Sequence, residues 1–187
     1  IKLKKIKWFF FSSTSHVYKF SQKKINEKSK LKPSSLYGLT KLKAEKYIQK
    51  KLKKAKIPFC IGRIFSFTHK KQTSDFVIPG IIKKAKSNKK IVYFKNTNHY
   101  RDFLSTSDIC KAINILFKKR ANGIYNIGSG KKILISHIIK LIFKKYKKIY
   151  RINEKNKSTW LVADINKIKK FKWKPKNNIL SIINELT

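Results

Sequence analysis

Short apolar runs alternate with amphipathic segments along most of the chain. Residues 57–65 (IPFCIGRIF) form a continuous apolar run, which is typical of a parallel strand covered on both faces. Residues 6–13 form a second, aromatic run that ends in hydroxyl residues. Between them, residues 35–55 place apolar side chains at helical spacing after a Pro-Ser-Ser start signal. Strands that alternate with helices predict an α/β fold with a parallel sheet.

The remaining segments follow the same alternation. Ser107 or Asp108 is expected to cap the helix that begins at residue 109, because its side-chain oxygen can accept a first-turn amide. A polar loop is expected over residues 66–74, and a strand followed by a turn over 123–130. The other expected elements are helices at 75–87, 109–119, 135–146, 164–171 and 178–186, a strand at 91–94 and a short extended piece at 101–103.

The charge is the most unusual part of the composition. The chain has 187 residues with 48 Lys+Arg against 8 Asp+Glu, a formal net charge of +40. Such a charge makes a basic nucleic-acid-binding module one candidate function. Arginine, which reads base edges with two parallel hydrogen bonds, occurs only at positions 63, 101, 120 and 151. The lysines lie in nearly every segment outside the expected strands, which favours a compositional bias over a binding face, so we expect no nucleic-acid partner.

Several other classes of protein are excluded. Two cysteines, Cys60 and Cys110, are too few for a disulfide framework or a zinc site, and both are expected to be small buried residues. No apolar stretch is long enough for a membrane span, and the N-terminus lacks the features of a signal peptide, so we expect a cytoplasmic protein without metal. There is no methionine, and the chain opens directly on a strand-like segment. We therefore expect that its beginning is missing.

A tyrosine followed four residues later by a lysine is the first candidate for chemistry. This spacing puts both side chains on one face of a helix, where an ammonium beside a phenol suits general acid or base catalysis. Tyr37 and Lys41 have this spacing, but so do Tyr47 and Lys51, because lysine is so common here. The context favours the first pair, since it begins its helix and follows a strand that ends in SSTSHVY (12–18).

With these residues, the chain resembles the extended short-chain dehydrogenase/reductase family, the NAD(P)-dependent sugar-nucleotide epimerases, dehydratases and reductases. Further blocks resemble the family in the same order along the chain. They are GRIFSF (62–67), YRDFLSTSDICKAI (100–113), YNIGSG (125–130) and VADINKIKKFKWKPK (162–176). The resemblance covers nearly the whole sequence.

The resemblance implies hydride exchange between NAD or NADP and a carbon of the hexose of a nucleotide-diphosphate sugar. Tyr37 would move the hydroxyl proton, Thr14 would hold that oxygen, and Lys41 would bind the nicotinamide ribose. Phe65 would line the nicotinamide pocket. Arg101 would contact the diphosphate, as would Ser66, although the family usually has asparagine at that position.

Departures from the family pattern narrow the expected reaction. In sugar 4,6-dehydratases Asp-Glu typically follows the threonine, whereas Ser15 and His16 stand there in this chain. Dehydration is therefore disfavoured, and a 4-keto reductase or a 4-epimerase is expected. Residues 63–79 look most like the GDP-4-keto-6-deoxymannose reductases, although His69-Lys70 replaces their Gly-Pro. A catalytically inactive family remnant is the other alternative.

The resemblance also divides the chain. Residues 1–65 would form the C-terminal half of a Rossmann NAD(P)-binding domain, and residues 66–187 mainly a small α/β sugar-nucleotide-binding region with strands that return to the Rossmann sheet. The family's N-terminal glycine-rich loop is absent, because none of the six glycines forms it. We therefore expect weak NAD(P) binding by this polypeptide alone. The resemblance also implies a homodimer in the full-length protein, through the helix that carries Tyr37 and Lys41.

Overall fold

The structure is a computed structural model that describes residues 5–154 and 157–187. Its central sheet has three parallel strands in the order β1-β2-β7, which are β1 (Phe9–Thr14), β2 (Phe59–Ile64) and β7 (Gly123–Ile127). Thr14 pairs with Ile64, and Ile64 with Ile127, so the carboxyl ends of the three strands lie side by side. The predicted parallel α/β sheet is confirmed.

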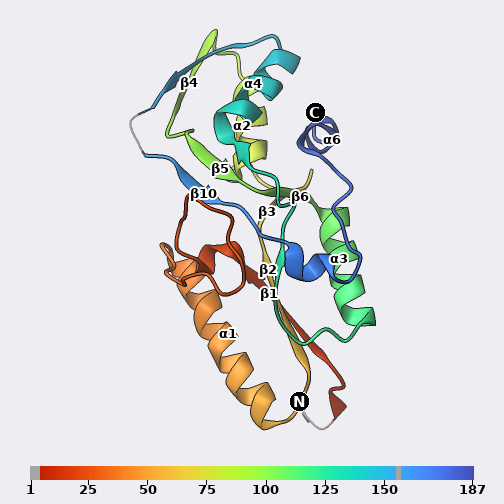
Figure 1. Cartoon of the computed structure of the whole chain (residues 1–187). Coiled ribbons are helices and arrows are strands. Elements are labelled where there is room, and N and C mark those ends of the chain that lie inside the picture. The colour runs from red at the N-terminus through yellow and green to blue at the C-terminus, as the bar shows by residue number, and fades with distance from the viewer. Residues whose placement is uncertain (1–4, 155–156) are drawn as a thin grey trace.

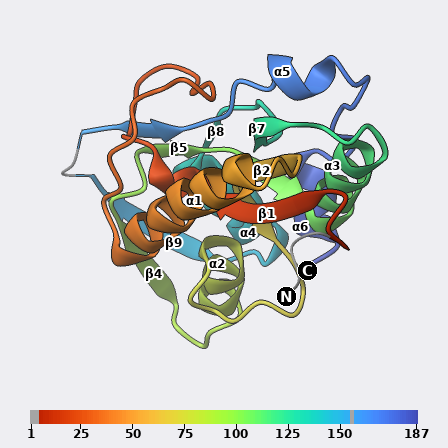
Figure 2. The ribbon, with the colours of Figure 1, turned by 90° about the horizontal axis from the view of Figure 1, so that it is seen from below.

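Helices cover both faces of this sheet, α1 (Leu36–Lys54) on one side and α3 (Thr106–Lys118) on the other (Figure 1). Figure 2 shows α1 lying across β1 and β2. On the α1 side, Leu52 packs with Phe59 and Ile61 of β2. Alternate residues of β2 therefore serve two different cores, because Cys60 packs with α3. This double burial explains the uninterrupted apolar run of residues 57–65.

Gly62 lies in the middle of β2, where two side chains from the flanking strands meet over it. A Cβ at this position would lie 2.6 Å from Phe10 Cζ and 2.9 Å from Ile127 Cδ1. Phe10 belongs to β1 and Ile127 to β7, so the side chains of the two outer strands bridge the central one.

The upper part of the molecule in Figure 1 has its own core. The parallel strands β4 (Ile91–Lys95) and β9 (Ile149–Asn153) pack their inward side chains against α2 (Val77–Ala85) and α4 (Ile135–Lys145). Val92 and Phe94 point into this core, whereas Tyr93 between them is exposed, as expected for a sheet with one covered face.

Short elements connect the two parts. Two parallel strands, β3 (Ser66–Thr68) and β6 (Phe103–Ser105), form one pair, and β10 (Thr159–Leu161), β5 (His99–Arg101) and β8 (Ile133–Leu134) form a small mixed sheet. The remaining helices are η2 (Ser15–Val17), α5 (Asn166–Lys169) and α6 (Ile179–Asn184). The expected polar loop at residues 66–74 therefore begins with a strand, and β8, β9 and β10 were not predicted.

Two expectations about α3 are wrong. The N-cap is Ser105, whose Oγ accepts a hydrogen bond from the amide of Asp108 at 3.1 Å, so neither Ser107 nor Asp108 is the cap. The helix starts earlier because β6 runs directly into it. Cys110 is exposed on α3, while Cys60 is buried as expected.

Asp108 links the first turn of α3 to the segment that precedes α6. Its carboxylate accepts hydrogen bonds from the amides of Lys176 and Asn177, each at 3.0 Å, and from Ser105 Oγ at 3.1 Å. Burial acts to raise the pKa of Asp108, but these hydrogen bonds, with that of the Asn177 side chain, hold it below its usual value.

A carboxyl group with a lowered pKa stabilises the fold above its unfolded pKa of ~3.9, and that contribution is lost as the pH falls through the lower native pKa. We expect Asp108→Asn to lower the free energy of unfolding at pH 7 by about 1–3 kcal/mol and to weaken its acid dependence below pH ~4. Urea unfolding at several pH values measures both. The exposed Asp75→Asn is the control, and equal behaviour of the two variants would contradict the expectation.

No helix within residues 5–154 and 157–187 is long and apolar enough to cross a membrane.

Candidate active site

The predicted catalytic residues lie at the carboxyl end of the central sheet, where ligands bind in open parallel sheets. Thr14 is the last residue of β1, and Tyr37 lies in the first turn of α1. Ser35 caps this helix, because its Oγ accepts a hydrogen bond from the amide of Gly38 at 3.2 Å. Strand end and helix start therefore meet at one place.

Lys41 lies on the same face of α1 as Tyr37, with its Nζ 5.9 Å from the centre of the tyrosine ring. The Tyr37 side chain is 54% exposed and its hydroxyl has no hydrogen-bond partner among the described residues. Lys41 Nζ donates to the carbonyl of Ser12 at 2.9 Å, which leaves two of its three hydrogens for a ligand. The pair is oriented by the protein and open to solvent.

The competing pair, Tyr47 with Lys51, has a similar internal geometry. Lys51 Nζ lies 5.5 Å from the centre of the Tyr47 ring, and both residues lie farther along α1. Among the described residues, neither side chain makes a hydrogen bond or a ring contact with the end of β1. The end of β1 therefore distinguishes the Tyr37 pair, as the sequence context predicted.

His16 contacts the Tyr37 ring and links it to Thr14. Thr14 is only 5% exposed, and its Oγ1 accepts a hydrogen bond from the backbone amide of His16 at 3.3 Å. The hydroxyl hydrogen of Thr14 has no acceptor in the part of the chain that the structure describes. The His16 ring stands edge-on to Tyr37, with ring centres 6.1 Å apart. Thr14 thus retains a donor for a ligand oxygen.

Gly38 allows η2 to lie directly against α1. A Cβ at this position would come within 2.4 Å of the carbonyl oxygen of His16, so any side chain must push the two elements apart. We expect Gly38→Ala to lower the free energy of unfolding by about 1–3 kcal/mol, because the crowded atom is backbone. Denaturant unfolding measures the change.

The matched control is Lys46→Ala, an exposed position on the same helix. At an uncrowded helical site, replacing glycine by alanine stabilises by roughly 0.5–1 kcal/mol. A stabilised Gly38→Ala protein would therefore contradict the close approach.

Arg101 is mostly buried and has no acidic partner among the described residues. Its Nη1 donates to the carbonyl oxygens of Tyr100 at 2.9 Å and Thr159 at 3.1 Å, and its guanidinium lies over the Phe20 ring at 5.3 Å. Burial lowers the pKa of Arg101 and no carboxylate acts against it. The charge of Arg101 also lowers the pKa of His16, after the larger effect of burial.

Phe65 and Ser66 follow the end of β2. Phe65 is 2% exposed and packs beside Tyr18, with ring centres 6.3 Å apart, so its side chain belongs to the core. Ser66 is partly buried in β3. The roles of Phe65 at a nicotinamide and of Ser66 at a diphosphate stay predictions.

A buried polar network beneath the site was not predicted. Arg63 of β2 forms a salt bridge with Glu45 of α1, with 2.7 Å between Nη2 and Oε2, and its Nη1 donates to the Tyr18 hydroxyl at 2.9 Å. Tyr18 in turn donates to Asn126 Oδ1 at 2.7 Å, and Ser13 Oγ donates to Glu45. Burial raises the pKa of Tyr18 to about 12, which keeps its hydroxyl protonated as a donor.

This network ties α1, the helix that carries Tyr37 and Lys41, to the sheet. Glu45 is fully buried one turn after Lys41. It accepts a hydrogen bond from Ser13, the residue that precedes Thr14. The sequence carries one signal of this role: Glu45 is the only acidic residue in α1, and it falls on the buried stripe with Gly38, Leu42 and Leu52. An acid on a buried stripe requires a cationic partner.

The glycine-rich turn after β7 does not present free amides. The amides of Ser129 and Gly130 donate to the carboxylate of Asp102 at 2.6 and 2.8 Å, and Ala163 donates to it at 3.1 Å. Backbone amides of this kind bind anions, but here a side-chain carboxylate already fills the position. The turn is therefore not a phosphate-binding loop, in agreement with the expectation that none of the six glycines forms one.

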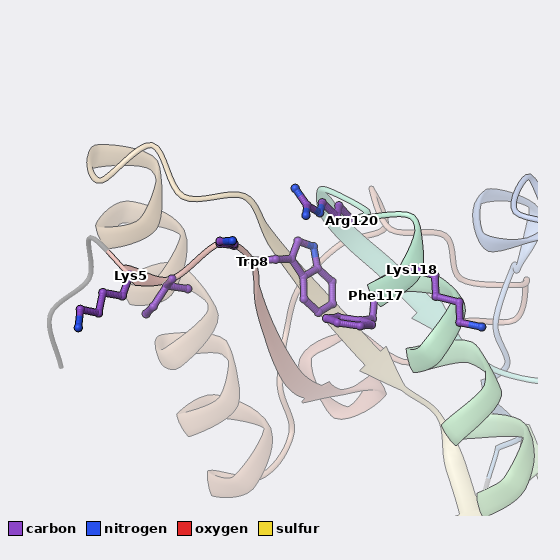
Figure 3. A pocket seen from close by; sticks show the side chains of 7 residues that line it. Lys5, Trp8, Phe117, Lys118 and Arg120 are labelled. Atoms are coloured by element: carbon purple, nitrogen blue, oxygen red, sulfur yellow. The ribbon is translucent and has the colours of Figure 1, made fainter.

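One cleft lies away from these residues, beside the amino end of β1 and the carboxyl end of α3 (Figure 3). Its volume is about 600 Å³. Trp8 and Phe117 face each other there, while Lys5 and Lys118 point away from them. A second cleft of about 400 Å³ lies between the end of α1 and the start of β7. Neither cleft contains a predicted site residue.

Comparisons with known proteins agree on one family. Residues 1–128 match the NAD dependent epimerase/dehydratase family. The chain is 34% identical over 139 residues to the uncharacterized UDP-glucose epimerase YtcB of Bacillus subtilis (strain 168), which covers 73% of this chain and 44% of that protein. It is 31% identical over 142 residues to the dTDP-D-glucose 4,6-dehydratase of Dictyostelium discoideum, which covers 69% and 33%.

Solved structures share the fold. RMD from Pseudomonas aeruginosa, complexed with NADPH, superimposes with a TM-score of 0.87 at 19% identity, over 96% of this chain and 65% of that one. UDP-glucuronic acid 4-epimerase from Bacillus cereus, in complex with NAD, gives a TM-score of 0.83 at 25% identity, over 97% and 58%. The chain thus spans less than half of the two curated relatives and about three fifths of these structures.

Proposed function

The chain belongs to the NAD dependent epimerase/dehydratase family, and from this premise we propose that it carries the catalytic and sugar-nucleotide-binding residues of a nucleotide-sugar 4-keto reductase or 4-epimerase. Both reactions move a hydride at a hexose carbon and a proton at the oxygen on that carbon. Residues up to 65 would contribute to the NAD(P) side of the site, and residues from 66 onward mainly to the sugar-nucleotide side.

The donors beside Tyr37 fit a nicotinamide cofactor, which supplies or accepts the hydride when bound. Lys41 keeps two N–H groups for ribose hydroxyls after its bond to Ser12. Tyr37 gives its phenolic proton to the carbonyl oxygen of the sugar during reduction, and takes it back during oxidation. The free hydroxyl hydrogen of Thr14 holds the same oxygen in place.

The guanidinium of Arg101, unpaired among the described residues, is the single observation that supports sugar-nucleotide binding. A mostly buried guanidinium normally has a carboxylate partner, as Arg63 has in Glu45. Arg101 has none among the described residues, and its Nε and Nη2 donate to no protein atom there. A diphosphate is the kind of anion that a planar arginine fork binds best. The charge of Arg101 also acts on His16, whose ring lies edge-on to Tyr37.

A substrate panel tests the proposal. The protein as its gene encodes it is incubated with UDP-glucose, UDP-glucuronic acid or dTDP-glucose and NAD⁺, and with dTDP-4-dehydro-6-deoxyglucose and NADPH, and the products are identified by NMR. We expect C4 inversion or reduction of the keto group, and no dehydration product, because Ser15 and His16 offer no carboxyl pair. Consumption of none of these compounds would overturn the proposed activity and favour an inactive remnant.

Nucleic-acid binding is the competing function. Two of the cations that line the cleft beside Trp8 and Phe117, Lys5 and Lys118, point away from its aromatic rings (Figure 3). Filter binding at physiological salt measures this alternative directly, and we expect only weak binding that falls steeply with salt. Sequence-specific nanomolar binding would favour the alternative.

A further inference from the structure

His16 differs from two of the other histidines in having a ring free to react. His69 Nδ1 accepts a hydrogen bond from the amide of Lys71 at 3.2 Å, and His99 Nδ1 lies 3.1 Å from Thr159 Oγ1. Neither ring nitrogen of His16 is hydrogen-bonded within residues 5–154 and 157–187. His137 is exposed on α4, away from the site. His16 is therefore the one histidine with free nitrogens beside Tyr37.

The backbone of His16 is fixed relative to Tyr37. Its amide donates to Thr14 Oγ1, and its carbonyl lies against Gly38, the residue that follows Tyr37. The edge-on contact of the two rings, with centres 6.1 Å apart, is therefore held by the same packing that joins η2 to α1. A histidine in a free loop would have no such constraint.

The groups that face His16 keep its imidazole neutral near pH 7. Burial and the charge of Arg101 both lower the pKa of His16, and no carboxylate opposes them. Tyr37 faces the ring from α1, and Lys41 lies beyond Tyr37. A neutral imidazole carries one N–H donor and one nitrogen acceptor, so it can pass a proton in either direction.

We propose that His16 exchanges the catalytic proton between Tyr37 and solvent. The inference rests on the proposed function, since it concerns the same site. In the reductive direction Tyr37 loses its proton to the sugar oxygen and becomes a phenolate. The N–H of His16 then gives its proton to that phenolate, while the other ring nitrogen takes a proton from water, so one solvent proton enters and the imidazole ends neutral. The oxidative direction reverses these transfers.

The relay gives His16→Phe a specific kinetic result. With a nucleotide sugar that the wild-type protein converts, we expect turnover to fall by about 10²-fold, the low end of the range for one proton-transferring group. Imidazole added to the buffer should restore part of the rate, because it replaces the missing carrier. Calorimetric affinity for UDP should be unchanged. His137→Phe is the control, because that imidazole is exposed and distant.

Two outcomes separate this inference from the function beneath it. If Tyr37→Phe is inactive while His16→Phe keeps full turnover, the relay is overturned and the proposed function survives. If Tyr37→Phe keeps full turnover, both are overturned. A loss in His16→Phe that imidazole does not restore, together with weaker UDP binding, would show a structural role and also overturn the relay.

NMR titration gives a readout without turnover. The ring protons of His16 should report a pKa below the ordinary histidine value of about 6.5. A His16 imidazole that is fully charged at pH 7 would overturn the relay, because both nitrogens would then be donors.

Discussion

Tyr37→Phe is expected to lower the turnover of a nucleotide-sugar substrate by about 10²–10⁴-fold, the contribution of one positioned acid or base. The variant removes the hydroxyl and keeps the ring that lies beside His16 and Lys41. Stability should change little, because that hydroxyl is exposed and makes no hydrogen bond to the described residues. Turnover under saturating substrate, with the melting temperature of each protein, measures both effects.

Tyr47→Phe is the matched control. Tyr47 lies on the same helix, is also exposed, and has its own lysine four residues later. Tyr47 differs from Tyr37 in that the end of β1 does not lie beside it. Equal losses in the two variants would mean that the tyrosine-lysine spacing, and not the position beside Thr14, determines the effect, which would contradict the proposed role of Tyr37.

Glu45→Gln is expected to lower the free energy of unfolding by about 3–5 kcal/mol, because it leaves the Arg63 guanidinium buried without a counter-charge. Burial acts to lower the pKa of Arg63, but the hydrogen bonds that Arg63 donates to Glu45 and Tyr18, with the charge of Glu45, raise it above its usual value. Without Glu45 this compensation is lost, yet an arginine is effectively always protonated, so the buried charge remains. Urea unfolding at pH 7 measures the loss.

Two further variants distinguish the loss of the Glu45–Arg63 salt bridge from the loss of one negative charge. Glu185→Gln removes one negative charge at an exposed site and should change stability by less than about 0.5 kcal/mol. Glu45→Leu combined with Arg63→Leu removes both charges and should recover part of the loss. A Glu45→Gln protein as stable as Glu185→Gln would contradict an energetic role of the buried pair.

Long periodic or continuous segments made the main elements predictable. The apolar run before Arg63 and the leucine pattern after Ser35 gave the correct strand and helix, because burial on two faces or on one stripe leaves a clear pattern. Strands β3, β8 and β10 have only two or three residues, and they exist through partners distant in sequence. No local pattern carries that information.

Some residues of the candidate site could be predicted from the sequence, and others could not. Tyr37 and Lys41 could be predicted from spacing and context, since a helix fixes their relation. The buried pairing of Glu45 with Arg63 depends on how α1 packs against β2, and the effect of the Arg101 charge on the pKa of His16 depends on where the fold places β5 and η2. Residues 18 or more positions apart become neighbours only in the folded sheet, so sequence spacing alone does not reveal them.

The bridge of Phe10 and Ile127 over Gly62 bears on how movement passes through the protein. A sheet held only by its backbone ladder can shear, with one strand sliding along the next. Here Phe10 and Ile127 lie over Gly62, so either outer strand could slide along β2 only if these two side chains moved. A displacement caused by a ligand at the end of β1 would therefore be passed to β7 and to the Asp102-bound turn that follows it.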